Sequence, residues 1–378
     1  MKTSQPRAGG PGPHPDADAR RIRLLGLCET AQGGVGIYQN LIGGLRDQGF
    51  DVHVIAPDQH AWILDEDLPV SRFDRPRRGI GALLRMIATF GSVRRTFRPD
   101  ICFFHSTFAL PALAYARLRG VRGPLIYCAH GWAVRNYAPG SLKGRVVRLI
   151  EGRLCGLADV VINVSQAEKS LAEHHGYRGR HIVVDNAVPE ARPDARGDLF
   201  ADRPDETHLL FVGRFDRQKG LDLLLPAFAA AREVRPDLTL HVVGDGVRSG
   251  FEVDRDQPGV QFAGWVPSDR IDDWYRSADA LVVPSRWEGL PLVIPEAYRN
   301  GTPVLCSTAS GMDALVDHGR TGTSFDLTPQ AITAALLAFS REDLRSMREA
   351  ARQRYLDRYR ISRLREELAG VLQELVRR

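Results

Sequence analysis

Two carboxylates that stand eight positions apart, Glu288 and Glu296, lie in a segment rich in proline and glycine. A carboxylate in a loop and another in the following helix can each accept hydrogen bonds from a pair of sugar hydroxyls. From the helical rise and side-chain reach, the two groups stand about 10 Å apart, which suits the two ends of a nucleotide-sugar. Ser285 and the helix N-terminus would take the phosphates between them. The alternative is a helix-capping Glu288 and an ordinary surface Glu296.

Two cations, Arg214 and Lys219, stand five positions apart around a predicted turn between a strand and a helix. Both side chains can therefore point to the same side, where two fixed cations suit a diphosphate. A diphosphate without such cations needs a metal ion or more helix dipole, so the pair predicts a site that works without metal. The alternative is a charged turn that is simply solvated.

Three glycines, Gly33, Gly34 and Gly36, follow an apolar run and open a predicted helix. Their backbone N–H groups can approach a ligand closely at a helix N-terminus, which favours an anion. The spacing is neither that of a dinucleotide-binding loop nor that of a P-loop, and a tight turn without a ligand is the alternative. His130 stands between another apolar run and Gly131. It is either a hydrogen-bond partner of the substrate or a core histidine.

Short apolar runs alternate with helix-period segments, which predicts parallel sheets covered by helices on both faces. Helix-like stretches include Ile37–Leu45, Ile80–Phe97 and Leu142–Cys155, and from Pro329 onward the pattern is helical throughout. The apolar runs are Ile22–Leu27, Val52–Ala56, Ile101–Phe104, Leu125–Ala129, Val160–Val164, Ile182–Val184, Leu209–Val212, Leu240–Val243, Val260–Phe262, Ala280–Val283 and Val304–Cys306.

The alternation stops and restarts, which predicts two doubly wound Rossmann-like halves. Residues 1–20 are rich in Pro, Gly and Asp and are expected to form a disordered tail. We expect an N-terminal domain at 21–189, a linker at 190–206 and a C-terminal domain at 207–359. Residues 360–378 carry an amphipathic helical stripe. Because ligands bind outside the carboxyl ends of parallel strands, the candidate residues of both halves should meet in a cleft between them.

Composition excludes several classes of protein. The chain has 378 residues, of which 43% are hydrophobic and 26% charged, values close to those of globular proteins. No apolar run reaches the ~18 residues of a membrane-spanning helix, and the first twenty residues lack the apolar core of a secretory signal. The five cysteines are scattered, without zinc-ligand spacing, which favours a reducing cytoplasm.

The net charge of +5 is unevenly distributed. Between Arg72 and Arg153, sixteen Arg and Lys residues face three acidic ones, so this part carries +13 and the remainder −8. Such asymmetry suggests that one half meets an anionic surface or ligand. No zinc finger, RNP box or GXXG clamp accompanies it, so nucleic acid is not expected as the partner. An anionic membrane or a phosphate-bearing lipid explains the charge equally well.

The motifs in this order resemble the retaining family 4 glycosyltransferases of GT-B fold. The most specific piece is Pro284-Ser-Arg-Trp-Glu-Gly-Leu-Pro-Leu-Val-Ile-Pro-Glu-Ala297, followed by Gly301-Thr-Pro-Val304. Val212-Gly-Arg-Phe-x-x-Gln-Lys-Gly220, Val243-Gly-Asp-Gly246 and the glycines at 33–36 complete the pattern. Ser310-Gly-Met-Asp313 departs from it, since the family often has a Gly-Gly pair and a Glu there. A looser likeness to the exopolysaccharide and capsule subgroup lies around His130 and Asp185.

The resemblance implies a C-terminal helix that crosses back onto the N-terminal half, and a role for each matching residue. Arg214 and Lys219 would bind the donor diphosphate, Glu288 the hydroxyls of the donor sugar and Glu296 the ribose. His130 would lie beside the sugar ring near the acceptor. No metal and no side-chain nucleophile would be needed, because the leaving phosphate helps to deprotonate the acceptor hydroxyl on the front face. The remaining donor-binding residues implied by the match are Gly33, Gly34, Gly36, Gly244, Ser285, Gly289, Leu290 and Gly311.

The leading hypothesis is a cytoplasmic, peripheral membrane enzyme that moves a hexose from a nucleoside diphosphate sugar to a polyprenyl-diphosphate-linked or other saccharide. UDP is favoured as the carrier on frequency alone. The amphipathic segment that starts at Ile80, flanked by Arg77, Arg78, Arg94 and Arg95, is expected to lie on an anionic bilayer, unless it packs on its own sheet. Alternatives are a soluble sugar or sugar-phosphate acceptor, a non-catalytic nucleotide-sugar binding module, and a nicotinamide dehydrogenase, which the missing G-x-G-x-x-G disfavours.

Overall fold

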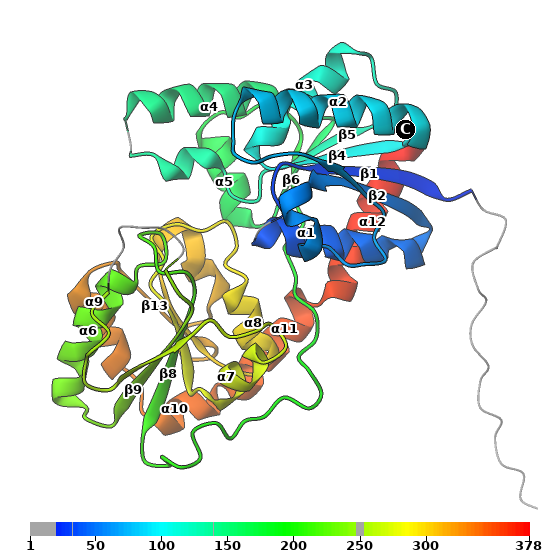
Figure 1. Ribbon diagram of the computed structural model, residues 1–378. Coiled ribbons are helices and arrows are strands. Elements are labelled where there is room, and N and C mark those ends of the chain that lie inside the picture. Colours follow the sequence, from blue (N-terminus) through cyan, green and yellow to red (C-terminus); the bar gives the residue numbers. More distant parts are fainter. Residues whose placement is uncertain (1–19, 32, 139, 247–252) are drawn as a thin grey trace, which may run out of the picture.

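The computed structural model describes residues 20–31, 33–138, 140–246 and 253–378, which form two domains joined by one crossing segment and a C-terminal helix (Figure 1). The expected disordered tail at residues 1–20 lies, except for Arg20, outside the described residues. No helix in the described ranges combines the length and the apolar character that crossing a bilayer requires.

The N-terminal domain is built on a seven-stranded sheet in the order β3-β2-β1-β4-β5-β6-β7, and every described pairing in it is parallel. Side chains alternate between its two faces, so Leu24 packs in one apolar cluster and Leu25 in another. The sheet is therefore covered on both sides, as expected. The strands are β1 Ile22–Cys28, β2 Phe50–Pro57, β3 Val70–Phe73, β4 Ile101–His105, β5 Leu125–Cys128, β6 Val160–Asn163 and β7 His181–Val183.

The helices of this domain divide between the two faces. Tyr38 and Ile42 of α1 pack in the cluster of Leu24, whereas Met86 of α2 and Leu113 of α3 pack in the cluster of Leu25. The helices are α1 Gly34–Gly43, α2 Ile80–Phe97, α3 Leu110–Leu118, α4 Leu142–Leu154 and α5 Gln166–His174, with 3-10 turns η1 Gly44–Gln48, η2 Asp58–Ile63, η3 Thr107–Ala109, η4 Ala133–Asn136 and η5 Cys155–Leu157.

The C-terminal domain repeats this plan on a six-stranded parallel sheet in the order β10-β9-β8-β11-β12-β13. Phe228 of α6 and Ile332 of α9 pack on one face, and Ile294 of α8 packs on the other. Its elements are β8 Thr207–Val212, α6 Leu221–Val234, β9 Leu238–Val243, β10 Val260–Gly264, α7 Ile271–Ser277, β11 Ala280–Val283, α8 Val293–Arg299, β12 Val304–Ser307, η6 Ala309–Leu315, β13 Gly322–Phe325, α9 Pro329–Leu337, α10 Arg341–Ser346 and α11 Arg348–Arg358.

Two segments connect the domains. Between β7 and β8, residues 184–206 contain neither helix nor strand. The last helix, α12 (Ile361–Arg377), returns to the N-terminal domain, where the Arg365 Nε donates to the Leu41 carbonyl oxygen at 3.0 Å (Figure 1). Its apolar stripe is buried at Leu364, Leu368 and Leu372. The predicted doubly wound halves and the crossing helix are thereby confirmed.

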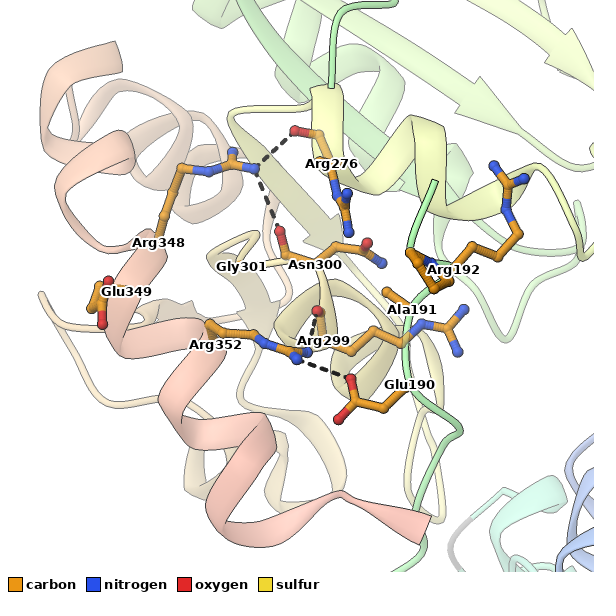
Figure 2. A pocket seen from close by; sticks show the side chains of 11 residues that line it. Glu190, Ala191, Arg192, Arg276, Arg299, Asn300, Gly301, Arg348, Glu349 and Arg352 are labelled. Carbon is orange, nitrogen blue, oxygen red and sulfur yellow. Dashed lines mark hydrogen bonds and ion pairs between the residues drawn. The ribbon is translucent and has the colours of Figure 1, made fainter. Parts of the chain in front are cut away.

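An arginine-lined hollow of about 490 Å³ lies where the connecting segment meets α8 and α11 (Figure 2). Arg299 pairs with Asp272 at 2.9 Å, and Arg352 pairs with Glu190 at 2.9 Å. Arg348 donates to backbone carbonyls at the C-terminal ends of α7 and α8, where the helix dipole is negative. Because these donors are already used, the hollow is a structural joint between the connecting segment and the C-terminal domain.

Candidate active site

The predicted site residues follow the carboxyl ends of strands in both domains. His130 follows β5, Lys219 follows β8 and Glu288 follows β11. The chain reverses direction at these points, so the side chains face the space between the two sheets. The structure brings the loops that carry His130 and Glu288 into direct contact, through the bonds described below.

An ion pair forms the centre of the site. Lys219 Nζ lies 2.7 Å from Glu288 Oε1, and only 8% of Glu288 is exposed. Gln218 Nε2 donates to the second carboxylate oxygen at 3.4 Å and to the Trp287 carbonyl oxygen at 3.0 Å. The turn after β8 can come this close because residue 220 is glycine, at a φ of 72°, where a Cβ would lie 2.0 Å from the Pro284 carbonyl oxygen.

Arg214 lies at the outer end of this network. Its side chain is half-exposed, pairs with Asp216 at 3.1 Å and donates to Gln218 Oε1 at 3.4 Å. Gln218 therefore bridges Arg214 to Glu288. The sequence interpretation named both charged residues but missed Gln218, although it stands inside the quoted motif next to Lys219.

The N-terminal domain holds the backbone of Glu288 and Gly289 from across the cleft. The Arg135 guanidinium donates to the Glu288 carbonyl oxygen, and Ser165 Oγ donates to that of Gly289 at 2.9 Å. A Cβ on Gly289 would lie 2.5 Å from Glu168 Oε1. A side chain at residue 289 would therefore press on Glu168 where the two domains meet.

Sequence reasoning missed these three residues of the N-terminal domain. Ser165 and Glu168 form an S-x-x-E pattern, and the Ser165 side chain accepts a hydrogen bond from the Glu168 backbone N–H at the start of α5. That capping signature was visible in the sequence. Nothing in the sequence, however, indicates that the same serine reaches Gly289, 124 positions away.

Burial shapes the electrostatics on this side of the cleft. Burial raises the pKa of Glu168, while its bond from the Val164 N–H and the charge of Arg135 oppose that shift. Burial lowers the pKa of Arg135, and the carboxylates of Glu168 and Glu288 oppose the shift. The carboxylates thus favour the charged form of Arg135 beside the loop that it holds.

His130 belongs to a buried histidine pair. Its Nε2 lies 3.0 Å from His105 Nδ1, and its ring meets Tyr38 edge-on with centroids 4.7 Å apart. Burial lowers the pKa of His130 to about 3, so the imidazole is neutral at physiological pH. A left-handed φ of 54° turns the backbone sharply at this residue. These contacts are those of the core alternative, a buried histidine with a hydrogen-bond partner inside the protein, and a contact with substrate stays a prediction.

The glycine loop contacts the opposite domain. Helix α1 begins at Gly34, and a Cβ on that residue would lie 3.8 Å from Leu292, just before α8. At Gly36 a Cβ would lie 1.9 Å from the Ala31 carbonyl oxygen, so only glycine allows the loop to turn into the helix at this point. The loop thus lies against the segment that joins Glu288 to α8.

Glu296 lies in the first turn of α8, apart from the ion pair. It accepts a hydrogen bond from the Tyr275 hydroxyl at 2.9 Å, and burial raises its pKa. The Tyr275 hydroxyl donates to Glu296 in the way that a ribose hydroxyl would.

The remaining predicted donor residues lie around the same strand ends. Ser285 and Leu290 are buried, and the Ser285 carbonyl oxygen accepts from Ser307 Oγ at 2.6 Å. The Gly244 N–H donates to the Gly264 carbonyl oxygen at 2.8 Å. Gly311, inside η6, faces Ala167 of α5, since a Cβ on it would lie 2.9 Å from the Cβ of that alanine. The contact given for Ser285 is thus made by its backbone carbonyl oxygen, and its side chain is buried.

The segment expected to lie on a membrane forms helix α2, which packs one face against the sheet. Ala82, Met86 and Phe90 of α2 are buried against the sheet, so the apolar face of this helix belongs to the core. Arg78 donates to Glu29 at 3.0 Å, within the protein. Arg77 and Arg95 are exposed, and Arg94 is partly buried. The alternative interpretation, a helix packed on its own sheet, accounts for this buried face. Ile80 and Leu84 of α2 are exposed, and contact with a membrane stays a prediction.

The described residues contain no group of three or more His, Cys, Asp or Glu side chains that would hold a metal ion. All five cysteines are buried and unpaired. Burial raises the pKa of Cys28, Cys102 and Cys306 to about 12, so these thiols are neutral core groups.

Comparison with known proteins matches both domains. A family described as "Glycosyl transferase 4-like domain" matches residues 33–187, and one described as "Glycosyl transferases group 1" matches residues 206–342. A D-inositol 3-phosphate glycosyltransferase of Pseudarthrobacter chlorophenolicus is 31% identical over 358 residues, which span 81% of this chain and 83% of that protein. A Klebsiella pneumoniae protein described as an uncharacterized 41.2 kDa protein in the cps region is 28% identical and covers 80% of this chain and 85% of its own length.

Among solved structures, Anabaena Alr3699/HepE in complex with UDP and glucose superposes with a TM-score of 0.76. The match covers 94% of this chain and 100% of that one, at 21% identity. Similarity at this level of identity establishes a shared fold.

Proposed function

Since the chain belongs to the family 4 glycosyltransferases of GT-B fold, we propose that it transfers a hexose from a nucleoside diphosphate sugar to a saccharide acceptor. UDP is the favoured carrier, in line with the UDP bound in Anabaena HepE. The reaction proceeds with retention at the anomeric carbon and without a metal ion. The cations Lys219 and Arg214 take the place of the metal in carrying the charge of the leaving diphosphate.

The observation that carries this proposal is the ion pair between Lys219 and Glu288. When the donor binds, its diphosphate takes the Lys219 ammonium and the half-exposed Arg214 guanidinium. Glu288 is then free to accept hydrogen bonds from the sugar hydroxyls. Arg135 and Ser165 hold the backbone of this loop from the other domain, so the sugar is fixed against the acceptor side.

In the transfer step, the bond between the anomeric carbon and the phosphate oxygen breaks while the acceptor oxygen bonds to the same face of that carbon. The proton of the acceptor hydroxyl moves to the leaving phosphate oxygen, so no side-chain base is required. His130 is neutral and orients hydroxyls as a hydrogen-bond partner. Electrostatic stabilisation of the leaving diphosphate supplies the largest share of the rate enhancement.

The favoured acceptor is a lipid-linked saccharide of surface polysaccharide synthesis. The Klebsiella relative from the cps region supports this class. A soluble sugar phosphate is the second candidate, which the inositol 3-phosphate glycosyltransferase supports. In both cases the enzyme acts in the cytoplasm. Nucleotide-sugars occur there, and the reducing conditions keep thiols such as those of this chain unpaired.

Helix α4 supports membrane association better than α2 does. Four aliphatic side chains on one side of α4, namely Leu142, Val146, Leu149 and Ile150, are exposed, and we call them the α4 apolar face. Lys143, Arg145, Arg148 and Arg153 are exposed on the same helix, and its only acidic residue, Glu151, is buried. Exposed aliphatic groups among cations, with no exposed acid, match the inner surface of an anionic bilayer.

The decisive experiment is a thermal-shift panel of UDP-, GDP- and ADP-sugars, each with and without EDTA. A ligand at ~100 times its dissociation constant adds about 2.7 kcal/mol of stability, which is a shift of a few degrees for a chain of this size. We expect a rise for one base only, insensitive to EDTA. A chain that responds to NAD and to none of these donors would remove the proposal. The anomeric configuration of the product, read by NMR, tests retention.

A further inference from the structure

A second cavity, of about 680 Å³, lies beside the candidate active site. Helices α4 and α5 and turn η4 form its N-terminal-domain wall, and Arg286 and Trp287 of the loop before Glu288 form the opposite wall. We call it the α4 cavity. Its volume falls within the range of small-molecule sites. Among its described lining residues are four arginines, Arg135, Arg145, Arg148 and Arg286, and no carboxylate.

Two of these arginines are held by the protein itself. Arg286 forms a bidentate ion pair with Asp222, in which both N–O distances are 2.8 Å. Arg135 donates to the carbonyl oxygens of Glu288 and Ala167. These bonds fix the positions of the two arginines, which therefore form the wall of the cavity and do not serve as ligands. Arg286 is also neutralised by its carboxylate partner.

The other two, Arg145 and Arg148, have no hydrogen bond or ion pair from their side chains within the part of the chain that the structure describes. They stand three positions apart on α4, so they lie on neighbouring turns of the same side of the helix. Glu151 of the same helix gives them no counter-charge, because it is buried and accepts from Thr107 Oγ1 at 2.6 Å and from the Ala133 N–H at 3.0 Å.

Every charged side chain among the described residues that line the α4 cavity is an arginine. His175 lines the cavity, and its pKa is lowered first by burial and then by the charges of His174, Arg148 and Arg135. Tyr137 and Trp287 supply apolar ring faces with polar edges, which suit the flat faces of a sugar.

We propose that the α4 cavity binds a phosphate or diphosphate group carried by the acceptor saccharide, with Arg145 and Arg148 as its ligands and Tyr137 and Trp287 against the sugar. The guanidinium fork fits phosphate oxygens in pairs, and two such forks satisfy a doubly charged group. This inference rests on the proposed function, since it names the chemistry of the acceptor. The group has two possible sources, a free sugar phosphate or the diphosphate of a lipid-linked saccharide.

The position of the cavity supports an acceptor role. Trp287 precedes Glu288 in the chain, and Arg135 both lines the cavity and donates to the Glu288 carbonyl oxygen. A phosphate held here therefore lies against the loop that carries the sugar-binding carboxylate. The α4 apolar face is on the same helix as Arg145 and Arg148, so a bilayer at α4 would lie close to these two cations.

The test is calorimetric titration with D-glucose 6-phosphate and with farnesyl diphosphate, each in the absence of UDP and with UDP at saturation to occupy the donor site. The double variant Arg145→Gln/Arg148→Gln is compared with the wild-type protein and with Lys143→Gln/Arg153→Gln. The control removes two cations from the same helix that do not line the cavity.

We expect the double variant to weaken binding of the preferred probe about ten- to a hundredfold, the effect of losing hydrogen bonds to a charged group, with UDP affinity unchanged. The control should stay within about twofold. Preference for glucose 6-phosphate assigns a free sugar phosphate, and preference for farnesyl diphosphate assigns a lipid source.

Equal binding by the double variant and the wild type overturns the inference, and so does binding of neither probe by the wild type. A wild-type protein that binds a probe at Arg145 and Arg148 but never binds UDP retains the phosphate site and removes the proposed donor. The two failures are therefore separate.

Discussion

At the scale of single residues, Glu288 and Lys219 each neutralise the charge of the other. In the described structure the carboxylate is nearly buried, and its donors are Lys219 at 2.7 Å and Gln218 at 3.4 Å. Removing either charge leaves the other poorly solvated in the cleft. A donor diphosphate competes for the same ammonium, which couples arrival of the phosphate to release of the carboxylate.

We expect Glu288→Gln and Lys219→Ala each to lower kcat/KM by tens to thousands of times, since each removes a contact that strengthens in the transition state. Initial rates of sugar transfer, measured together with thermal unfolding, separate this effect from misfolding. Glu233→Gln, an exposed carboxylate on α6, is the control and should keep its full rate. Near-normal rates in both site variants would contradict the assignment.

At the scale of elements, α2 and α4 differ in which face they bury. Helix α2 buries Met86 and Phe90 at helical spacing against the sheet. The fully buried residues of α4 are Gly144, Glu151 and Gly152, and Leu154 at its end packs against the apolar cluster of Leu25. The residues of the α4 apolar face lie on its outer side, and 76% of Leu142 is exposed.

Replacing the α4 apolar face with glutamine at Leu142, Val146, Leu149 and Ile150 should lower partitioning onto anionic vesicles at least tenfold, because the aliphatic groups no longer enter the interface. Vesicle co-sedimentation measures the change. Thermal stability should hardly alter, since these side chains are exposed. Val234→Gln, an exposed aliphatic residue of the C-terminal domain, is the control. Unchanged partitioning of the α4 variant would rule out this face as the membrane surface.

At the scale of the whole molecule, each domain contains a buried histidine pair. His105 faces His130 at 3.0 Å, and His208 faces His241 at 3.2 Å. Burial lowers the pKa of all four, to about 3 for His130 and His241. The unfolded chain therefore binds protons near pH 6.5 that the folded protein does not, and these groups make stability fall as the pH drops from 6.5 toward 3.

We expect His241→Phe to flatten the dependence of unfolding free energy on pH below 6.5 by about 1.4 kcal/mol per pH unit, the contribution of one proton. Denaturant unfolding of the variant and the wild type between pH 7.5 and 5 measures it. Buried carboxyls such as Glu296, whose pKa is raised, act in the opposite direction in both proteins and cancel in the difference. Parallel curves would show that His241 titrates normally in the folded state.

The sequence by itself determined the elements and the motifs, because both depend on local order along the chain. Buried parallel strands read as apolar runs, and the positions of the eleven predicted runs match strands of the two sheets. The strands that were missed, β3 (Val70–Phe73) and β13 (Gly322–Phe325), are four-residue edge strands. Each has two polar residues at its centre, Ser71-Arg72 and Thr323-Ser324, so neither reads as an apolar run, whereas the edge strands β7 and β10 were predicted.

Tertiary structure alone decided which distant groups meet. His105 and His130 are 25 positions apart, and Arg135 and Glu288 are 153 apart. It also decided that α2 turns its apolar face inward while α4 turns its own outward, and that Arg145 and Arg148 border a cavity. Local periodicity shows that a helix has an apolar side. Whether that side packs against another element depends on where all the other elements lie, and their positions are determined by residues throughout the chain.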